Sequence, residues 1–223
     1  MTFKLFFSAI LKFFLGVALV GLLIFLPAGS FNYLNGWLLM GLLFIPMFIV
    51  GIIMMIKDPN LLASRLNAKE KQKEQDLVQK LSGLMFIAGF VLSGLGYRFS
   101  WYSLPSWVVI VGAVLFVVAY VLYAEVLREN AYLSRTIQVQ EGQKVVDTGL
   151  YGVVRHPMYS ATVLLFLAMP LVLGSLYAFL VFLVYPFIIG FRIKYEEEFL
   201  EKELVGYAEY KSKVKYRLIP FIW

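Results

Sequence analysis

Residues 156–191 read HPMYSATVLLFLAMPLVLGSLYAFLVFLVYPFIIGF, and none of them is Asp, Glu, Lys or Arg. One helical membrane crossing takes about 17–25 apolar residues, so this run of 36 is long enough for two crossings joined by a tight turn. The run follows Arg155 and precedes Arg192-Ile193-Lys194-Tyr195-Glu196-Glu197. Polar groups at the two ends of such a hairpin would meet at one membrane face. Ionisable groups are costly to keep there, so this cluster is a candidate functional site.

The composition of the whole chain is that of a membrane protein. Hydrophobic residues make up 61% of its 223 residues, compared with about 45–50% in soluble domains. Further runs without charge cover 13–56, 81–97 and 99–124, and Pro27-Ala28-Gly29-Ser30 supplies a turn within the first. The sequence therefore predicts an all-α, polytopic membrane protein with about six transmembrane helices. We expect these helices at 10–28, 35–56, 80–97, 106–126, 158–174 and 176–191.

The basic residues predict the orientation of the chain. With the N-terminus inside, the outer loops 28–35 and 98–105 contain only Arg98, and the other 19 of the 20 Lys and Arg residues lie inside. This asymmetry follows the positive-inside rule. We therefore expect both termini in the cytoplasm, and an uncleaved first segment because its flank is a poor cleavage motif. Contact with anionic lipids accounts for the net charge of +6 without a nucleic-acid partner.

The chain divides into two expected regions. Residues 1–126 would form four transmembrane helices, with an amphipathic segment in the inner loop 57–80 that either lies on the membrane surface or gates lipid access. Residues 127–223 would contain a cofactor loop, the helical hairpin and a cytoplasmic tail. The chain has no cysteine and one histidine, which excludes Cys-based and His-rich metal sites, so we expect no metal.

The first end of the hairpin carries Arg155-His156-Pro157-Met158-Tyr159. Pro157 suits the first turn of a helix, where its missing N–H is not needed. His156 is then extended, because the residue before a proline avoids the helical region. Together with Arg155, this helix N-terminus could bind a carboxylate or a phosphate. The alternative is that Arg155 and His156 only cap an interfacial helix.

The second end of the hairpin carries the acidic residues. Arg192 and Glu196 are four positions apart and share one helix face, while Glu197 lies about 100° further round. These carboxylates could hold a cationic cofactor. The alternative is an ordinary surface ion pair, which stabilises a helix by only a few tenths of a kcal/mol.

Several motifs in roughly 125–223 resemble the isoprenylcysteine carboxyl methyltransferase family, which is itself similar to the membrane phospholipid N-methyltransferases. They are Gly149-x-Tyr151-x-x-x-Arg155-His156-Pro157-x-Tyr159, Arg192-x-x-x-Glu196-Glu197-x-x-Leu200, Gly206-Tyr207-x-x-Tyr210 and Arg217-Leu218-x-Pro220. Two departures are Ser160-Ala161, where a glycine is common, and one extra residue before Gly206. The second leaves open whether Glu196 or Glu197 is the main cofactor ligand.

The resemblance implies methyl transfer from S-adenosylmethionine to a lipidic acceptor at the boundary of membrane and cytoplasm. It implies that Arg192 and Arg155 are catalytic and that Arg192 binds the acceptor. The cofactor site would be built at the cytoplasmic end of the C-terminal hairpin, from Gln138, Gln143, Lys144, Val145, Val146, Tyr151, His156, Pro157, Tyr159, Glu196 and Glu197.

The acceptor and the reaction class have alternatives. An isoprenylcysteine-like carboxylate is the first expectation, because it needs no general base and Arg192 could bind it in a bidentate manner. A phospholipid amine and a hydrophobic carboxylic acid are the others. Tyr216-Arg217-Leu218-Ile219-Pro220 is also similar to the tail of NADPH-dependent membrane sterol reductases, although Glu196-Glu197-Glu198 disfavours a polyanionic cofactor. A non-catalytic lipid-binding protein is a further alternative. A transporter would need polar residues in mid-membrane, which these helices nearly lack.

Overall fold

The computed structural model of the chain describes residues 3–66, 73–133 and 139–223. These residues form helices joined by loops, and within them one isolated β-bridge pairs Ser103 with Ser175. The helices are α1 (Phe3–Ala28), α2 (Leu34–Lys57), α3 (Pro59–Leu66), α4 (Lys73–Arg98), α5 (Ser106–Glu129), the 3-10 helix η1 (Gly149–Gly152), α6 (Pro157–Val172), α7 (Leu176–Phe182), α8 (Tyr185–Glu203) and α9 (Tyr207–Lys213). The predicted all-α fold is therefore confirmed for the described residues.

Five segments of the described chain are long and apolar enough to cross a membrane: Lys4–Ala28, Leu34–Lys57, Asp76–Arg98, Ser106–Glu129 and Leu176–Glu203. The last segment contains α7 and α8, whereas α6 is a shorter apolar helix of 16 residues. Many large apolar side chains on these segments are exposed, as lipid-facing residues are; Ile45 is 63% exposed and Val121 is 64% exposed. The chain is a multi-pass integral membrane protein. Five of the six predicted ranges overlap one of the five segments each, and the sixth, 158–174, overlaps the shorter α6.

The turn of the predicted hairpin lies between α6 and α7. Gly174 has a φ of +68°, in the left-handed region, and a Cβ there would lie 2.8 Å from the nearest side chain. Ser175 caps α7 by accepting a hydrogen bond from the backbone N–H of Ala178 at 3.3 Å. The hydroxyl of Tyr33 donates to the carbonyl of Leu173 at 2.6 Å, which ties this turn to the start of α2. The turn is therefore fixed by local geometry and by the neighbouring helix.

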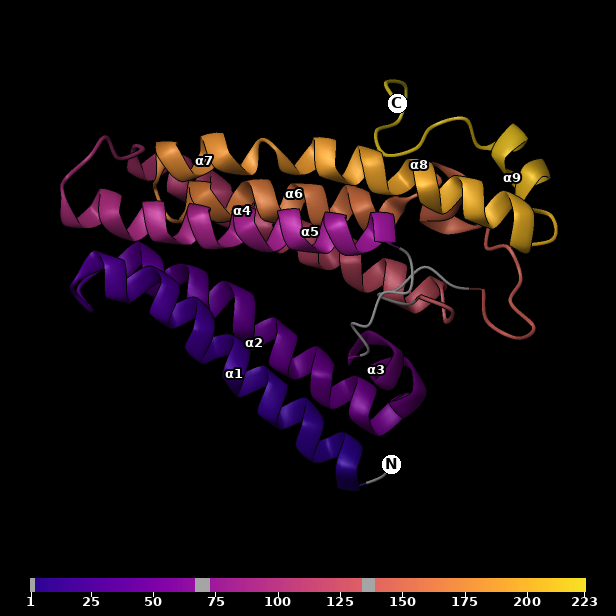
Figure 1. The fold of residues 1–223 in the computed structure, drawn as a ribbon, viewed down its shortest axis with the longest axis horizontal. Helices are drawn as coiled ribbons and strands as arrows, with labels where there is room; N and C mark the ends of the chain where they lie inside the picture. Colours follow the sequence, from indigo (N-terminus) through magenta and orange to yellow (C-terminus); the bar gives the residue numbers. More distant parts are fainter. Residues whose placement is uncertain (1–2, 67–72, 134–138) are drawn as a thin grey trace.

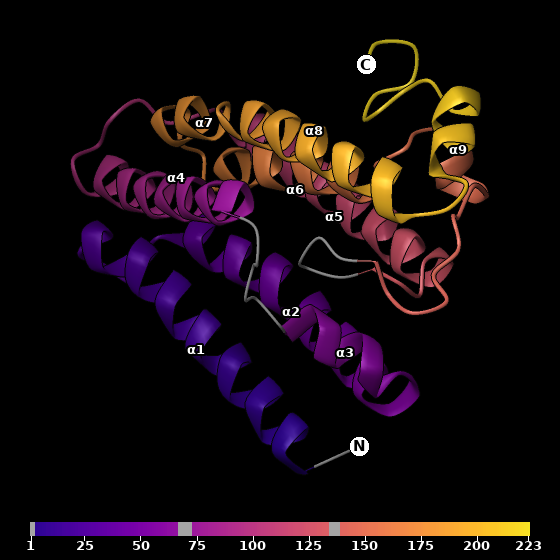
Figure 2. The same ribbon diagram turned by 45° about the vertical axis from the view of Figure 1, so that its right-hand side comes forward.

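The helices pack into two groups (Figure 1, Figure 2). Helices α4 to α8 run side by side, and α1 and α2 diverge from them towards the end that carries the N-terminus. Helix α6 packs most extensively on α5, and α4 packs on α1, α7 and α8. The shared core includes Ile24, Leu39, Phe116 and Phe182, each of them fully buried. The start of α1, the C-terminus, α3 and α9 lie in the right-hand half of Figure 1, and this side of the bundle is called the polar end below.

Helix α3 supplies part of the predicted inner loop 57–80, whose residues 67–72 lie outside the described chain. The carboxylate of Asp58 accepts the backbone N–H of Leu61 at 3.0 Å and caps the helix. Arg65, near the end of α3, donates to the hydroxyl of Tyr123 on α5 and lies 3.8 Å from the sulfur of Met158 on α6. This helix therefore lies against α5 and the start of α6.

The C-terminal tail crosses the start of α6. The N–H of Arg155 donates to the carbonyl of Tyr216 at 2.8 Å, and the N–H of His156 donates to the carbonyl of Arg217 at 2.9 Å. The hydroxyl of Ser160 donates to the carbonyl of Leu218 at 2.6 Å. These contacts place the tail directly on the predicted Arg-His-Pro motif.

Candidate functional site

A cavity of about 120 Å³ lies at the polar end of the helical bundle. Its walls come from the chain after α5, from η1, from the start of α6, from the end of α8 and from α9. The lining residues are Asn130, Tyr132, Leu133, Gln143, Lys144, Val145, Val146, Tyr151, Arg155, His156, Met158, Tyr159, Arg192, Glu196, Leu200, Leu204, Tyr207 and Tyr210.

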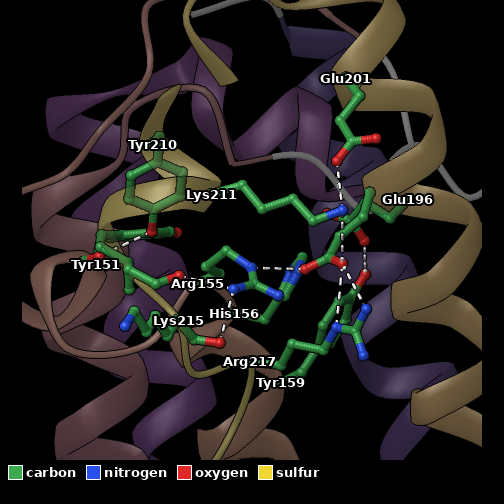
Figure 3. Close-up of polar contacts among 12 residues, drawn as sticks. Tyr151, Arg155, His156, Tyr159, Glu196, Glu201, Tyr210, Lys211, Lys215 and Arg217 are labelled. Carbon is green, nitrogen blue, oxygen red and sulfur yellow. Dashed lines mark hydrogen bonds and ion pairs between the residues drawn. The ribbon is translucent and has the colours of Figure 1, made fainter. Parts of the chain in front are cut away.

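The centre of the polar network is the carboxylate of Glu197, whose residue is 2% exposed. Oε1 lies 2.7 Å from Nε of Arg155 and 3.2 Å from Nε2 of His156. Oε2 lies 3.0 Å from Nη2 of Arg217 and 3.9 Å from Nζ of Lys211 (Figure 3). A buried carboxylate is tolerated only when it is paired and hydrogen-bonded, and Glu197 meets this condition on both oxygens.

Arg155 connects this network to the tail. Its Nη1 donates to the carbonyls of Val214 and Lys215, at 2.7 and 2.8 Å. Its Nε is held by Glu197, so one side chain joins α8, the start of α6 and the tail. Arg155 is 7% exposed, and its charge is used within the fold.

A second polar chain connects the two helices of the hairpin across the cavity. Nε of Arg192 donates to the hydroxyl of Tyr159 at 2.7 Å, and that hydroxyl donates to Oε2 of Glu196 (Figure 3). Arg192 and Tyr159 are 8% and 5% exposed, and all three residues line the cavity. Glu196 is the only acidic residue among the described residues that line it. The cavity therefore presents one carboxylate, fixed in place by a tyrosine and an arginine.

Tyrosines form the wall of the cavity on the side of α9. The hydroxyl of Tyr210 donates to the carbonyl of Tyr151 at 2.8 Å, and the hydroxyl of Tyr151 accepts from Nδ2 of Asn130 at 2.9 Å. Burial raises the pKa of Tyr151 to about 12. Burial likewise raises the pKa of Tyr210 above its ordinary value. Both tyrosines are therefore neutral at physiological pH.

The convergence of the two hairpin ends is confirmed, because Arg155 and His156 contact Glu197. Of the residues predicted for the site, those that line the cavity are Gln143, Lys144, Val145, Val146, Tyr151, Arg155, His156, Tyr159, Arg192 and Glu196. Pro157 begins α6 and Glu197 is buried behind the cavity, and neither is among the lining residues. Gln138 lies outside the described chain. The roles of all these residues in binding stay predictions.

The anion beside Arg155 and His156 is a residue of the chain itself. The sequence indicated that this pair, at the start of α6, could bind a carboxylate of a ligand. In the structure both side chains contact Glu197. Both side chains therefore already contact one carboxylate of the chain, and the acidic residue that faces the cavity is Glu196.

Several lining residues were not predicted: Asn130, Tyr132, Leu133, Met158, Leu200, Leu204, Tyr207 and Tyr210. Leu200 follows Glu196 by one helical turn on α8, so helical spacing carried a signal for it. Tyr207 and Tyr210 are part of the Gly-Tyr-x-x-Tyr motif, but nothing in the spacing places α9 beside the hairpin. Asn130 follows α5 as its C-cap, and its place in the wall depends on its bond to Tyr151.

One comparison with known proteins matches part of the chain to a family. Residues 107–205 match the model of the family described as phospholipid methyltransferase. The match runs from α5 through the hairpin to the end of α8, and it starts upstream of residue 127, so the expected two-region division stays a prediction. No curated protein matches the chain. A cavity with one fixed carboxylate, at the end of an apolar hairpin, lies largely within the matched range. Residues 107–205 are therefore a domain of the phospholipid methyltransferase family, and the chain is a membrane methyltransferase that uses S-adenosylmethionine.

Proposed function

We propose that the protein methylates the amine of a phospholipid headgroup. The description of the matched family favours this acceptor over a carboxylate. The observation that supports it in the structure is the cavity beside Glu196, at the end of helices that carry an exposed apolar surface. A lipid headgroup can reach such a site while its acyl chains stay in the bilayer.

The residues of the cavity fit S-adenosylmethionine. When bound, this cofactor supplies a methyl carbon on a positively charged sulfur, which a nucleophile with a free electron pair attacks. The carboxylate of Glu196 faces the cavity and offsets positive charge there. Leu200 and Leu204 provide an apolar wall, and Asn130 and Gln143 provide amide groups. A donor set of this kind suits a ligand with a cation, a flat base and several polar atoms.

Glu196 and Glu197 have different roles in this proposal. Glu196 lines the cavity and holds the positive charge of the cofactor. Glu197 is a positioning residue, because its two oxygens are used by Arg155, His156 and Arg217. It keeps His156 at the cavity wall and the tail over the start of α6.

The chemistry requires little of the protein besides binding and orientation. An amine attacks only as the free base, so the acceptor ammonium must first lose a proton to water. The bond from the methyl carbon to sulfur would then break as the new bond to nitrogen forms. Aliphatic amines titrate at about 8–10, which leaves a small reactive fraction at neutral pH. Tyr159 and Arg192 fix the orientation of Glu196, and a rigid site of this kind lowers the entropic barrier between two bound partners.

A carboxylate acceptor is the second candidate, because Arg192 favours it. Its guanidinium lines the cavity and is held at Nε by Tyr159, 2.7 Å away. Arginine is the side chain best suited to binding a carboxylate in a planar, bidentate manner. An isoprenylcysteine-like carboxylate would bind there.

The orientation in the membrane also stays a proposal. Both chain ends and the cavity residues lie at the polar end of the bundle. The excess of Lys and Arg in the segments at that end predicts that it faces the cytoplasm. The cofactor would then reach the cavity from the cytoplasm and the acceptor from the inner leaflet.

The experiment that tests the acceptor uses the chemical difference between the products. The protein is reconstituted in bilayers that contain phosphatidylethanolamine or a farnesylated cysteine analogue, and methyl-labelled S-adenosylmethionine is added. A methyl ester releases its label as methanol in base, whereas an N-methyl group does not. We expect base-stable label in the phospholipid. Base-labile label in the cysteine analogue alone would instead establish the carboxylate reaction. The Glu196→Gln variant is the control, because methyl transfer that depends on the cavity should be weaker in it.

A further inference from the structure

We propose that the hydroxyl of Tyr207 forms a hydrogen bond with a polar atom of bound S-adenosylmethionine. Tyr207 begins α9, is 4% exposed and lines the cavity. Among the described residues, Tyr207 Oη and Gln79 Nε2 are the buried side-chain polar atoms without a hydrogen-bond partner. Gln79 does not line the cavity, so Tyr207 is the described residue that both lines the cavity and carries an unsatisfied buried polar atom.

Tyr210, on the same helix, is a useful comparison, because its hydroxyl has a hydrogen-bond partner and that of Tyr207 has none. Tyr210 packs in the same cluster as Tyr207, together with Leu204 and Val214. The hydroxyl of Tyr210 donates to the carbonyl of Tyr151 at 2.8 Å, so it is satisfied within the chain. A buried hydroxyl without a partner destabilises a fold, and such groups are rare unless a ligand or another function uses them.

The position of Tyr207 favours the cofactor over the lipid acceptor as its partner. Helix α9 lies outside the five segments that are long and apolar enough to cross a membrane. The side chains that pack with Tyr207 include Val145, from the loop before η1, and Leu200 at the polar end of α8. A lipid headgroup reaches the cavity from the bilayer, and S-adenosylmethionine reaches it from water. Because α9 lies outside the candidate membrane spans, Tyr207 is better placed for the cofactor than for the lipid.

The protonation state of Tyr207 is suited to this role. Burial, followed by the charges of Glu197 and Glu196, raises its pKa well above the ordinary value. The hydroxyl is therefore neutral at any pH at which the protein works, and it keeps its proton for donation. This contact depends on the proposed location of the cofactor in the cavity beside Glu196.

Two conservative variants test the inference, because each removes one oxygen from a tyrosine of α9. We expect Tyr207→Phe to bind S-adenosylmethionine and S-adenosylhomocysteine about tenfold more weakly, as expected for one lost hydrogen bond in a buried site. Without cofactor, it should unfold at the same temperature as the unchanged protein or at a higher one, because an unpaired buried hydroxyl is removed. Tyr210→Phe should unfold at a lower temperature, because the carbonyl of Tyr151 loses its donor. Calorimetric titration and thermal unfolding in detergent measure both properties.

The outcomes separate this inference from the proposed site. Unchanged affinity of Tyr207→Phe, with weaker binding by Glu196→Gln, would overturn the role of Tyr207 and keep the cavity as the cofactor site. Unchanged affinity in both variants would overturn both. A Tyr207→Phe protein that loses thermal stability as Tyr210→Phe does would also overturn the inference, because the hydroxyl would then serve the fold.

Discussion

Arg155 and Glu197 are 42 positions apart in the sequence, and Nε of the arginine lies 2.7 Å from Oε1 of the glutamate. Helices α6 and α7 and most of α8 lie between them. This ion pair therefore closes the hairpin at its polar end, and it does so in a buried environment where both partners are under 10% exposed. The location of the cavity depends on this closure, because Arg155 lines the cavity and Glu197 holds it from behind.

Glu197→Gln should strongly destabilise the polar end. Arg155, His156 and Arg217 would lose their shared counter-charge, and breaking one partner of a buried charge network costs about 3–5 kcal/mol. Thermal unfolding in detergent without cofactor measures this effect. Glu201→Gln is the matched control, because the pair of Glu201 with Lys211 is partly exposed and surface pairs contribute at most about 1 kcal/mol. Equal stability of the two variants would contradict the assigned role of Glu197.

Glu196→Gln should weaken cofactor binding and leave the stability of the protein nearly unchanged, the opposite of Glu197→Gln. It removes the negative charge from the cavity and leaves the Glu197 network intact, so unfolding without cofactor should change little. Cofactor affinity should fall about tenfold or more, because a charge-assisted contact is worth about 1.5–3 kcal/mol. Calorimetric titration with S-adenosylmethionine measures the affinity. Glu198→Gln, the exposed next residue but one, is the control and should bind normally. A normal affinity of Glu196→Gln would remove this residue from the cofactor site.

The pH dependence of the reaction should distinguish an amine from a carboxylate acceptor. For an amine that titrates at about 8–10, the reactive fraction rises about tenfold per pH unit below that range. We therefore expect kcat/KM with phosphatidylethanolamine to rise steeply from pH 6 towards pH 8. A carboxylate is fully ionised above a pH of about 5, so its profile would be flat over the same interval. Initial rates at saturating S-adenosylmethionine measure the difference, and a flat profile would contradict the amine.

Alkaline pH should destabilise the protein through Tyr151. Burial raises its pKa from 10 to about 12, so the folded state binds this proton more tightly than the unfolded state does. A raised pKa contributes stability below the unfolded value, and this contribution is lost as the pH rises from about 10 to about 12. Unfolding temperatures measured across that interval should fall less in Tyr151→Phe than in the unchanged protein. Parallel curves would show that Tyr151 ionises as easily in the folded protein as in the unfolded chain.

Gly149→Ala should disturb η1. Gly149 has a φ of +50°, and a Cβ there would lie 2.0 Å from Oε1 of Glu129. The alanine would displace the carboxylate that accepts the N–H of Leu150, in addition to its backbone strain of about 1–3 kcal/mol. Gly142→Ala is the control, since Gly142 also has a positive φ but no atom within 4 Å of the added Cβ. Unfolding temperatures should fall more for Gly149→Ala, and an equal fall would show that Glu129 moves without cost.

The sequence predicted the membrane helices and the convergence of the two polar clusters for physical reasons. Long apolar runs need a bilayer or a core, and a hairpin brings its two ends to the same face. The contact of Arg155 with Glu197 follows from this topology. The turn at Gly174 could also be expected, because a residue without Cβ adopts a positive φ readily.

The sequence could not predict that Glu196 would line the cavity and Glu197 would be buried in the ion-pair network. Their directions on α8 differ by about 100°, and the sequence alone does not say which direction faces the cavity. The answer depends on the tail, because Arg217 and the carbonyls bound by Arg155 approach α8 on the side of Glu197. The place of Tyr207 was hidden for the same reason. It is set by packing between α9 and the loop before η1, and the spacing of residues in the sequence does not predict this contact.

The shortness of α6 has a consequence for how a lipid acceptor reaches the site. Its 16 residues span about 24 Å, which is less than the about 30 Å of hydrocarbon in a typical membrane. Every residue of α6 is buried or half-buried, because the neighbouring helices pack around it, so lipid covers those longer helices instead. A start of α6 below the membrane surface would place the cavity there too, and the acceptor headgroup would have to sink to reach it. Membrane thickness then becomes a variable of catalysis, and bilayers with shorter acyl chains should present the acceptor to the enzyme at a lower elastic cost.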